Sequence, residues 1–154
     1  MTWRVFGRSE PRQARFVDNA DGTVTDNATG LMWSKATLSE GAIDPRDAAR
    51  MCGKLDLAGH MDWRLPSDHE LLSLVDRSRY EPAIDIGAFP DTMSDCYWTA
   101  TECAWASYGA WIVDFSYGMA IYCNGARSDA FVRAVRSLPA DWQAEAPSPL
   151  RPSW

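Results

Sequence analysis

The sequence predicts a single α+β domain in which two helices accompany a mainly antiparallel, twisted sheet. Three observations predict it: turn residues separate short β-prone runs near the N-terminus, two helix N-cap motifs follow, and alternating apolar residues fill the C-terminal third. The 154 residues, of which 46 % are hydrophobic, suffice for one core. We expect the domain to span residues 14–138, after an N-terminal arm of residues 1–13 and before an extended, proline-rich tail of residues 139–154.

The first strands are predicted from the turns in RFVDNADGTVTDNATGLMWSK. Asp21 and Gly22 separate the runs RFV and TVT, which indicates a hairpin, and a second turn at residues 27–30 leads into a strand at residues 31–33. The acidic and amide side chains do not fit a calcium-binding EF-hand, because counting from Asp18 puts alanine and glycine at ligand positions. Turn formation explains these residues better than metal binding does.

Two helices are predicted from their N-terminal residues. Asp44 precedes Pro45 and is placed to cap a first helix, whose segment ends at Gly59. Ser67 and Glu70 have the spacing of a capping box and predict the start of a second helix. The residues expected on the buried sides are Ala48, Cys52 and Leu55 in the first helix and Leu71, Leu72, Leu74 and Val75 in the second.

The rest of the domain is predicted to be strands at residues 96–101, 110–115, 119–123 and 130–136, with a turn at residues 116–118. Alternation indicates one deep and one shallower face of the sheet. The deep face would carry Trp111, Val113 and Phe115, and the shallower face Ala110, Ile112 and Asp114. In the last strand, Val132 and Val135 are expected to pack in the core.

The chain has eight tryptophans, which is many for its length. We expect four to form the core because large rings bury much apolar surface, and four to lie at a surface or a subunit contact because they stand in poorly patterned stretches. The expected core residues are Trp33, Trp63, Trp98 and Trp111, and the expected surface residues are Trp3, Trp105, Trp142 and Trp154.

Charge and hydropathy exclude several classes of protein. A net charge of −6 argues against a nucleic-acid partner, and no apolar run is long enough for membrane insertion. Residues 1–13 lack the apolar stretch of a signal peptide, so we expect a cytoplasmic protein or a virion component.

The sequence contains no catalytic motif, and we predict a protein without catalytic residues or cofactor. His60 and His69 are the only histidines, and there is no GxSxG, HExxH or glycine-rich phosphate loop. The cysteines have no CxxC spacing, so no metal site is expected, and we favour free thiols although sequence alone leaves three complete pairings open. The four cysteines are Cys52, Cys96, Cys103 and Cys123.

Six ordered segments resemble a known family. FVDNADGTVTDNATGLMW, LAGHMDWRLPSDHELLSLVD, AIDIGAFPDT, YWTAT, AWIVDFSYG and FVRAVRS follow the order found in the Lcl C-terminal-domain-like family, over residues 16–137. The resemblance implies a C-type-lectin-like fold and a binding function, and it supplies no catalytic residue. Related proteins include the carbohydrate-binding end of a collagen-like adhesin, phage tail proteins and variable proteins of diversity-generating retroelements. Many carry a cysteine where this chain has Ala134, which leaves Cys52 without that partner.

The resemblance also suggests why the residues before the last strand lack a clean core pattern. In retroelement-diversified relatives this region is rewritten at adenines of asparagine codons, and an AAC codon changed at its first two positions can encode most residues found between Cys103 and Ala130. It cannot encode Trp105 or Met119. The region is rich in Tyr, Ser, Gly and Asn, as adaptable binding loops are. An ordinary hairpin with drifted surface positions is the alternative.

The preferred hypothesis is a phage or retroelement-diversified receptor-binding or ligand-binding protein, whose partner is a cell-surface protein or a glycan. A glycan-binding adhesin module and a cysteine-dependent enzyme of related fold are the two alternatives. Trimers are common among related adhesins and tail proteins, so a homo-oligomer is a further hypothesis. The predicted ligand-binding residues are Ala104, Trp105, Ser107, Tyr108, Tyr117, Met119, Ile121, Tyr122, Asn124, Arg127 and Asp129.

Overall fold

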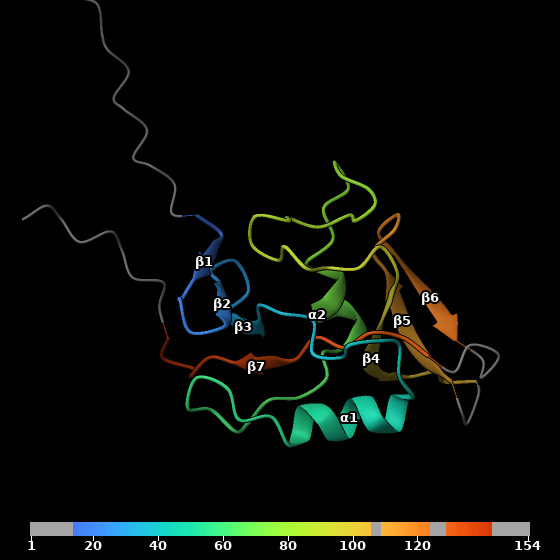
Figure 1. The fold of residues 1–154 in the computed structure, drawn as a ribbon, viewed down its shortest axis with the longest axis horizontal. Helices are drawn as coiled ribbons and strands as arrows, with labels where there is room; N and C mark the ends of the chain where they lie inside the picture. Colours follow the sequence, from blue (N-terminus) through green and yellow to red (C-terminus); the bar gives the residue numbers. More distant parts are fainter. Residues whose placement is uncertain (1–13, 106–108, 124–128, 143–154) are drawn as a thin grey trace, which may run out of the picture.

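Two antiparallel sheets and two helices make up the part of the chain that the computed structural model describes, which is residues 14–105, 109–123 and 129–142 (Figure 1). The first sheet has the order β1-β2-β3-β7 and the second the order β4-β5-β6. The strands are β1 (Phe16–Asp18), β2 (Thr23–Asp26), β3 (Leu31–Ser34), β4 (Cys96–Glu102), β5 (Ala110–Asp114), β6 (Met119–Cys123) and β7 (Val135–Ser137), and the helices are α1 (Pro45–Gly53) and α2 (Asp68–Leu72). The predicted α+β class is confirmed.

The first sheet brings the two ends of the domain together. Gly22 and Gly30 adopt positive φ angles of 89° and 72° in the two turns, a conformation that glycine reaches without strain. The last strand, β7, pairs antiparallel with β3, and Trp33 stands opposite Val135. Both side chains are fully buried.

Both helices begin where their capping residues predict. The Asp44 carboxylate accepts the backbone N–H of Arg46, and Ser67 and Glu70 form the reciprocal bonds of a capping box. The second helix is short, only five residues, because Leu74 and Val75 continue in a turn. Leu71 and Leu74 are buried, whereas Leu72 and Val75 pack at the margin of the core.

Both faces of β5 are covered, which corrects the prediction of one shallow face. Val113 packs with Tyr97 in the first core cluster, and Ile112 is 2 % exposed in a second cluster with Trp98. Alternation alone could not show this, because residues distant in the chain cover the second face: Ala48 and Cys52 of α1 and Trp63 belong to the cluster of Ile112.

Trp111 was expected in the core beside Trp33, Trp63 and Trp98, and for Trp111 this prediction is wrong. The other three tryptophans are at most 3 % exposed, whereas Trp111 is half-buried. It lies on the face of Val113 but further from the β5–β6 turn, and its ring neighbours there are Trp105 and Tyr122 rather than core residues.

The segment before β7 connects the two sheets instead of forming the predicted strand over residues 130–136. Only β7 is a strand, and Ala130 and Phe131 make single bridges to Ile43 and Tyr97. In Figure 1 this orange-to-red segment runs from the side of β4 to the side of β3. Val132 and Val135 are fully buried, so their predicted role in packing is confirmed.

Arg133, in the middle of this segment, is completely buried. Its Nη1 donates to the carbonyl oxygens of Ser34 at 2.7 Å and Lys35 at 2.6 Å, and its Nη2 donates to the Thr92 hydroxyl at 3.0 Å. The guanidinium therefore links the end of β3 to the loop that precedes β4.

Aromatic rings and one carboxylate complete the surroundings of Arg133. The guanidinium carbon lies 4.7 Å from the ring centre of Phe89 and 5.9 Å from that of Tyr97, and Nη2 lies 3.6 Å from an oxygen of Asp91. Burial lowers the pKa of Arg133, and Tyr97 and Asp91 act in the opposite direction.

The predicted extended tail begins with a turn instead. The backbone N–H of Trp142 donates to the carbonyl of Pro139 at 2.8 Å, and the Trp142 ring lies over Gly30. The remainder of the predicted tail and the predicted arm of residues 1–13, with Trp3 and Trp154, lie outside the described residues.

We expect Arg133→Met to lower the free energy of unfolding by about 3–5 kcal/mol, because the buried carbonyl groups would lose the hydrogen bonds that the guanidinium donates to them. Arg50→Met is the control, since the Arg50 side chain is 63 % exposed, and its effect should stay within about 0.5 kcal/mol. Urea denaturation measures both, and equal midpoints for the two variants would show that the buried guanidinium does not hold the sheets together.

Candidate functional site

Three aromatic rings lie together on one face of the second sheet, and we call Trp105, Trp111 and Tyr122 the aromatic cluster. Trp111 and Tyr122 stand opposite each other in β5 and β6, so their side chains share a face. Trp105 follows β4, and its ring centre lies 5.9 Å from that of Trp111 and 5.3 Å from that of Tyr122. The rings are inclined to one another by 88° and 55°.

The aromatic cluster is open to solvent on one side. Trp105 is 68 % exposed, and the other two rings are half-buried. A tryptophan that served only to cover the sheet would be mostly buried, whereas Trp105 exposes most of its surface. An exposed tryptophan among other rings is typical of a contact surface.

The other predicted binding residues do not all join this cluster. Met119 and Ile121, which are 49 % and 36 % exposed, lie on the opposite face of β6, beside Ile112. Tyr117 is 64 % exposed in the β5–β6 turn, at the end of the hairpin away from the cluster. The next residue, Gly118, has a φ of 81° and lies against Val75, so this turn is tightly packed although Tyr117 itself is open.

The remaining predicted residues show where along the chain the predicted binding surface begins and ends. Ala104 and Asp129 are exposed, whereas Cys103 and Ala130 are 5 % and 2 % exposed and belong to the interior. The surface therefore starts after Cys103 and ends before Ala130, slightly within the predicted range. Four predicted residues lie outside the described part of the chain: Ser107, Tyr108, Asn124 and Arg127.

Acidic groups outnumber basic groups in this region. Residues 102–130 contain Glu102, Asp114 and Asp129, against Arg127 as the one basic residue. Glu102 and Asp129 are exposed, and the Asp114 carboxylate accepts the backbone N–H of the turn residue Ser116. Glu102 pairs with Ala110, so its side chain lies on the face of the sheet opposite the aromatic cluster, and Asp114 lies at the β5–β6 turn.

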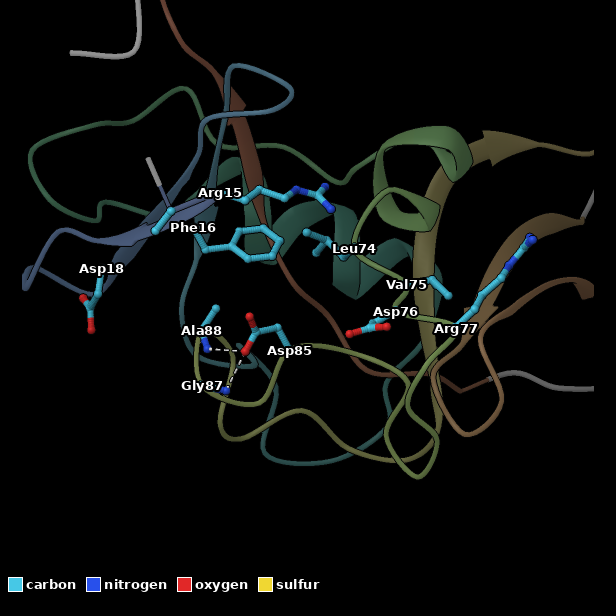
Figure 2. A pocket seen from close by; sticks show the side chains of 11 residues that line it. Arg15, Phe16, Asp18, Leu74, Val75, Asp76, Arg77, Asp85, Gly87 and Ala88 are labelled. Carbon is cyan, nitrogen blue, oxygen red and sulfur yellow. Dashed lines mark hydrogen bonds between the residues drawn. The ribbon is translucent and has the colours of Figure 1, made fainter. Parts of the chain in front are cut away.

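A groove of about 700 Å³ lies elsewhere, between β1 and the segments after α2 (Figure 2). It contains none of the predicted binding residues. Figure 2 shows the Phe16 ring at its centre, the Arg15 side chain along one side, and Asp76 and Asp85 on the other. No pattern in the sequence pointed to this groove, because three segments that are distant in the chain form it.

The polar groups of the groove are engaged in structure. Arg15 binds the buried Asp26 through two hydrogen bonds of 3.0 and 2.9 Å and also donates to the Ser73 carbonyl. Asp85 accepts two backbone N–H groups of its own turn. Hydrogen bonds from the side chain and the backbone N–H of Ser78 lower the pKa of the half-buried Asp76. Of the charged side chains that line the groove, Arg77 is exposed and has no hydrogen bond or ion pair with the described residues, whereas the others are engaged within the fold.

The described cysteines are poorly placed for catalysis. Cys52, Cys96 and Cys103 form no disulfide bond and are at most 5 % exposed. Burial raises the pKa of Cys52 to about 12, so that thiol stays protonated near neutral pH. Of the two histidines, His69 is exposed on α2 and His60 is half-buried in a turn.

Two other kinds of feature are absent from the described ranges. Between residues 14 and 142, apart from the two undescribed gaps, no group of three or more His, Cys, Asp and Glu residues is arranged to hold a metal ion. No helix in that part of the chain is long and apolar enough to cross a bilayer.

The chain matches the model of a known protein family. A model of the family described as Lcl C-terminal domain matches residues 22–136, which include both sheets except β1 and the end of β7. No curated protein matches the chain.

Three tryptophan substitutions test these placements in one series. Trp98→Ala should lower the free energy of unfolding by about 3–5 kcal/mol, because Trp98 is a core residue, and Trp111→Ala by about 1–3 kcal/mol, because Trp111 is half-buried among rings. Trp105→Ala should cost less than about 1 kcal/mol. Thermal and urea denaturation give the order, and a Trp105 variant as unstable as the Trp98 variant would make the aromatic cluster part of the core.

Proposed function

The chain belongs to the Lcl C-terminal domain family, and on this basis we propose that it is a binding protein that contacts an external ligand through the surface between Cys103 and Ala130. The observation that carries the proposal is the aromatic cluster, in which Trp105 remains 68 % exposed. Tryptophan and tyrosine contribute most to the affinity of protein interfaces.

The scaffold beneath this surface supports the same proposal. Core clusters cover both faces of β5, so the strand that carries Trp111 is held firmly. Binding residues that project from a rigid sheet lose little conformational freedom when a ligand binds. The aromatic cluster stands outside this packing, and its outer residues can therefore change without loss of the fold.

An enzymatic function has weaker support. The buried thiols and the absence of a catalytic motif leave the cysteine-dependent alternative without a reactive group among the described cysteines.

The family resemblance supports a more specific form of the proposal, in which a C-type-lectin-like scaffold displays a surface that varies between copies. Exposed positions such as Ala104, Ile121 and Asp129 are reachable from randomised asparagine codons, and the interior residues Cys103 and Ala130 limit the range over which variation would be tolerated. The partner would be a protein or glycan at a cell surface, met by a phage or a related particle.

A fixed glycan-binding module is the second candidate. The exposed ring of Trp105 favours it, because the face of an indole can stack against the apolar face of a sugar ring. A surface that stays constant between gene copies would distinguish this candidate from a variable one.

Binding can be tested directly with fluorescently labelled protein on a glycan array and on panels of bacterial cells. We expect saturable binding, and we expect Trp105→Ala and Tyr122→Ala to reduce the affinity by about 1–3 kcal/mol each. Tyr80→Ala is the control, since Tyr80 is an aromatic residue 73 % exposed outside this surface. Binding that all three variants retain would reject the aromatic cluster as the binding site.

Variation can be tested on DNA. If the surface is diversified, copies of the gene from related isolates should differ at adenine positions in the codons for residues 104–129, and a reverse-transcriptase gene should lie nearby with a near-copy of the 3′ end. Differences spread evenly over the gene would contradict diversification and leave the fixed module as the function.

A further inference from the structure

We infer that exposed apolar side chains around the β5–β6 turn form a two-fold symmetric contact with a second copy of this chain. The residues concerned are Tyr80, Ile86, Met93 and Tyr117, and we call them the turn patch. The inference does not depend on the proposed function, because the aromatic cluster lies at the other end of the β5–β6 hairpin. It rests on the exposure of the turn patch and on the charges beside it.

The two tyrosines of the turn patch come from segments that the fold joins. The backbone N–H of Glu81 donates to the carbonyl of Ser116 at 2.8 Å. Tyr80 and Tyr117 are the chain neighbours of these two residues, so they lie on adjoining segments. In Figure 1 the loop that follows α2 accordingly lies beside the turn between β5 and β6.

Two further side chains enlarge the turn patch. Ile86 and Tyr80 line the same hollow, which has a volume of about 290 Å³. Met93 precedes Ser94, whose carbonyl accepts the hydroxyl of Ser116 at 2.8 Å. Three segments that are distant in the sequence thus contribute apolar side chains to one area of the surface.

The turn patch leaves much apolar surface in contact with water. Tyr80 and Tyr117 are 73 % and 64 % exposed, and Ile86 and Met93 are 50 % and 47 % exposed. If a large side chain has about 200 Å² of surface, the four together expose roughly 450 Å². A standard interface buries about 800 Å² of each partner, so the turn patch with its polar surroundings suffices for a contact of modest size.

Two charged side chains beside the turn patch have no partner within the fold. Arg77 and Glu81 flank it in the stretch RSRYE, and both are exposed. Neither side chain forms a hydrogen bond or an ion pair with the described residues, whereas Arg79 between them binds Asp76 at 3.2 Å. Figure 2 shows Arg77 extending away from the Phe16 ring and the centre of the groove.

These two charges favour a second copy over other partners. Arg77 and Glu81 stand on either side of Tyr80 in the chain. A two-fold axis near Tyr80 therefore places Arg77 of one copy opposite Glu81 of the other, in two equivalent contacts. A strongly basic or strongly acidic partner would pair with one of the two groups and meet a like charge in the other.

Analytical ultracentrifugation of the whole chain between about 1 and 500 µM tests the pairing, because contacts of modest size are weak and reversible. We expect a monomer–dimer equilibrium. Tyr117→Ser should weaken it about tenfold or more, because exposed aromatic residues carry much of the energy of a contact. Met61→Ser is the control and should leave it unchanged, since Met61 is 74 % exposed outside the turn patch. Thermal denaturation verifies that each variant is folded.

Charge reversal tests the two-fold arrangement. Arg77→Glu and Glu81→Arg should each weaken the pairing about tenfold or more, because each puts like charges opposite one another in both contacts. An equimolar mixture of the two variants should form mixed dimers with an affinity within about threefold of that of the unmodified chain, since every contact then joins opposite charges. Arg50→Glu and Asp47→Arg change the net charge by the same amounts at exposed positions of α1, and they should have no effect.

Three results would overturn the inference. The first is a chain that remains monomeric throughout the concentration range, which would leave the turn patch to a different protein. The second is a dimer that neither Tyr117→Ser nor the charge reversals weaken, which would place the contact elsewhere on the surface. The third is a mixture of the two charge-reversed variants that pairs no better than either variant alone.

Discussion

The burial of one guanidinium holds the two sheets of this domain in place. Arg133 lies in the segment that leads from the second sheet back to β7 of the first, and it is fully buried together with its chain neighbours Val132 and Ala134. An unpaired charge there would be prohibitively unfavourable. The carbonyl groups at the end of β3, the Thr92 hydroxyl and the rings of Phe89 and Tyr97 compensate it, and they belong to three separate parts of the chain.

The arrangement of the sheets explains where a binding surface can lie. Near the β5–β6 turn, core clusters pack against both faces of β5, so substitutions there would disturb the packing. Toward the other end of the hairpin, the face that carries Trp111 no longer reaches the first core. There the rings of Trp111 in β5, Tyr122 in β6 and Trp105, which follows β4, meet one another at the surface. The well-packed sheet thus ends in a cluster of aromatic side chains that is open to solvent.

The groove beside β1 and the aromatic cluster differ in what their polar groups do. In the groove, Arg15 and Asp85 satisfy partners within the fold, and the resulting network joins β1 to the residues after α2. At the end of the second sheet where the aromatic cluster lies, Glu102 pairs with Ala110, so its exposed side chain is on the face opposite Trp111. The groove thus offers a cavity whose polar groups are mostly engaged, whereas the cluster offers exposed aromatic surface.

The sequence by itself determined the features that depend on residues close together in the chain. These features include the helix caps at Asp44 and Ser67 and the turns at Gly22 and Gly30, which involve contacts within about four residues and are encoded by local propensity. The α+β class follows from the order of such local elements along the chain. The ordered motifs also identified the family.

Only the tertiary structure decided how these elements cover one another. It buried Arg133, covered the second face of β5, left Trp111 half-buried, and brought Trp105 within 5.3 Å of Tyr122 from a position 17 residues away in the sequence. Hydrophobic alternation reports which residues share a face of a strand, but it does not report which distant segment will pack against that face. That choice depends on the sum of contacts between segments far apart in the chain, because burial is rewarded only where another element removes the surface from water.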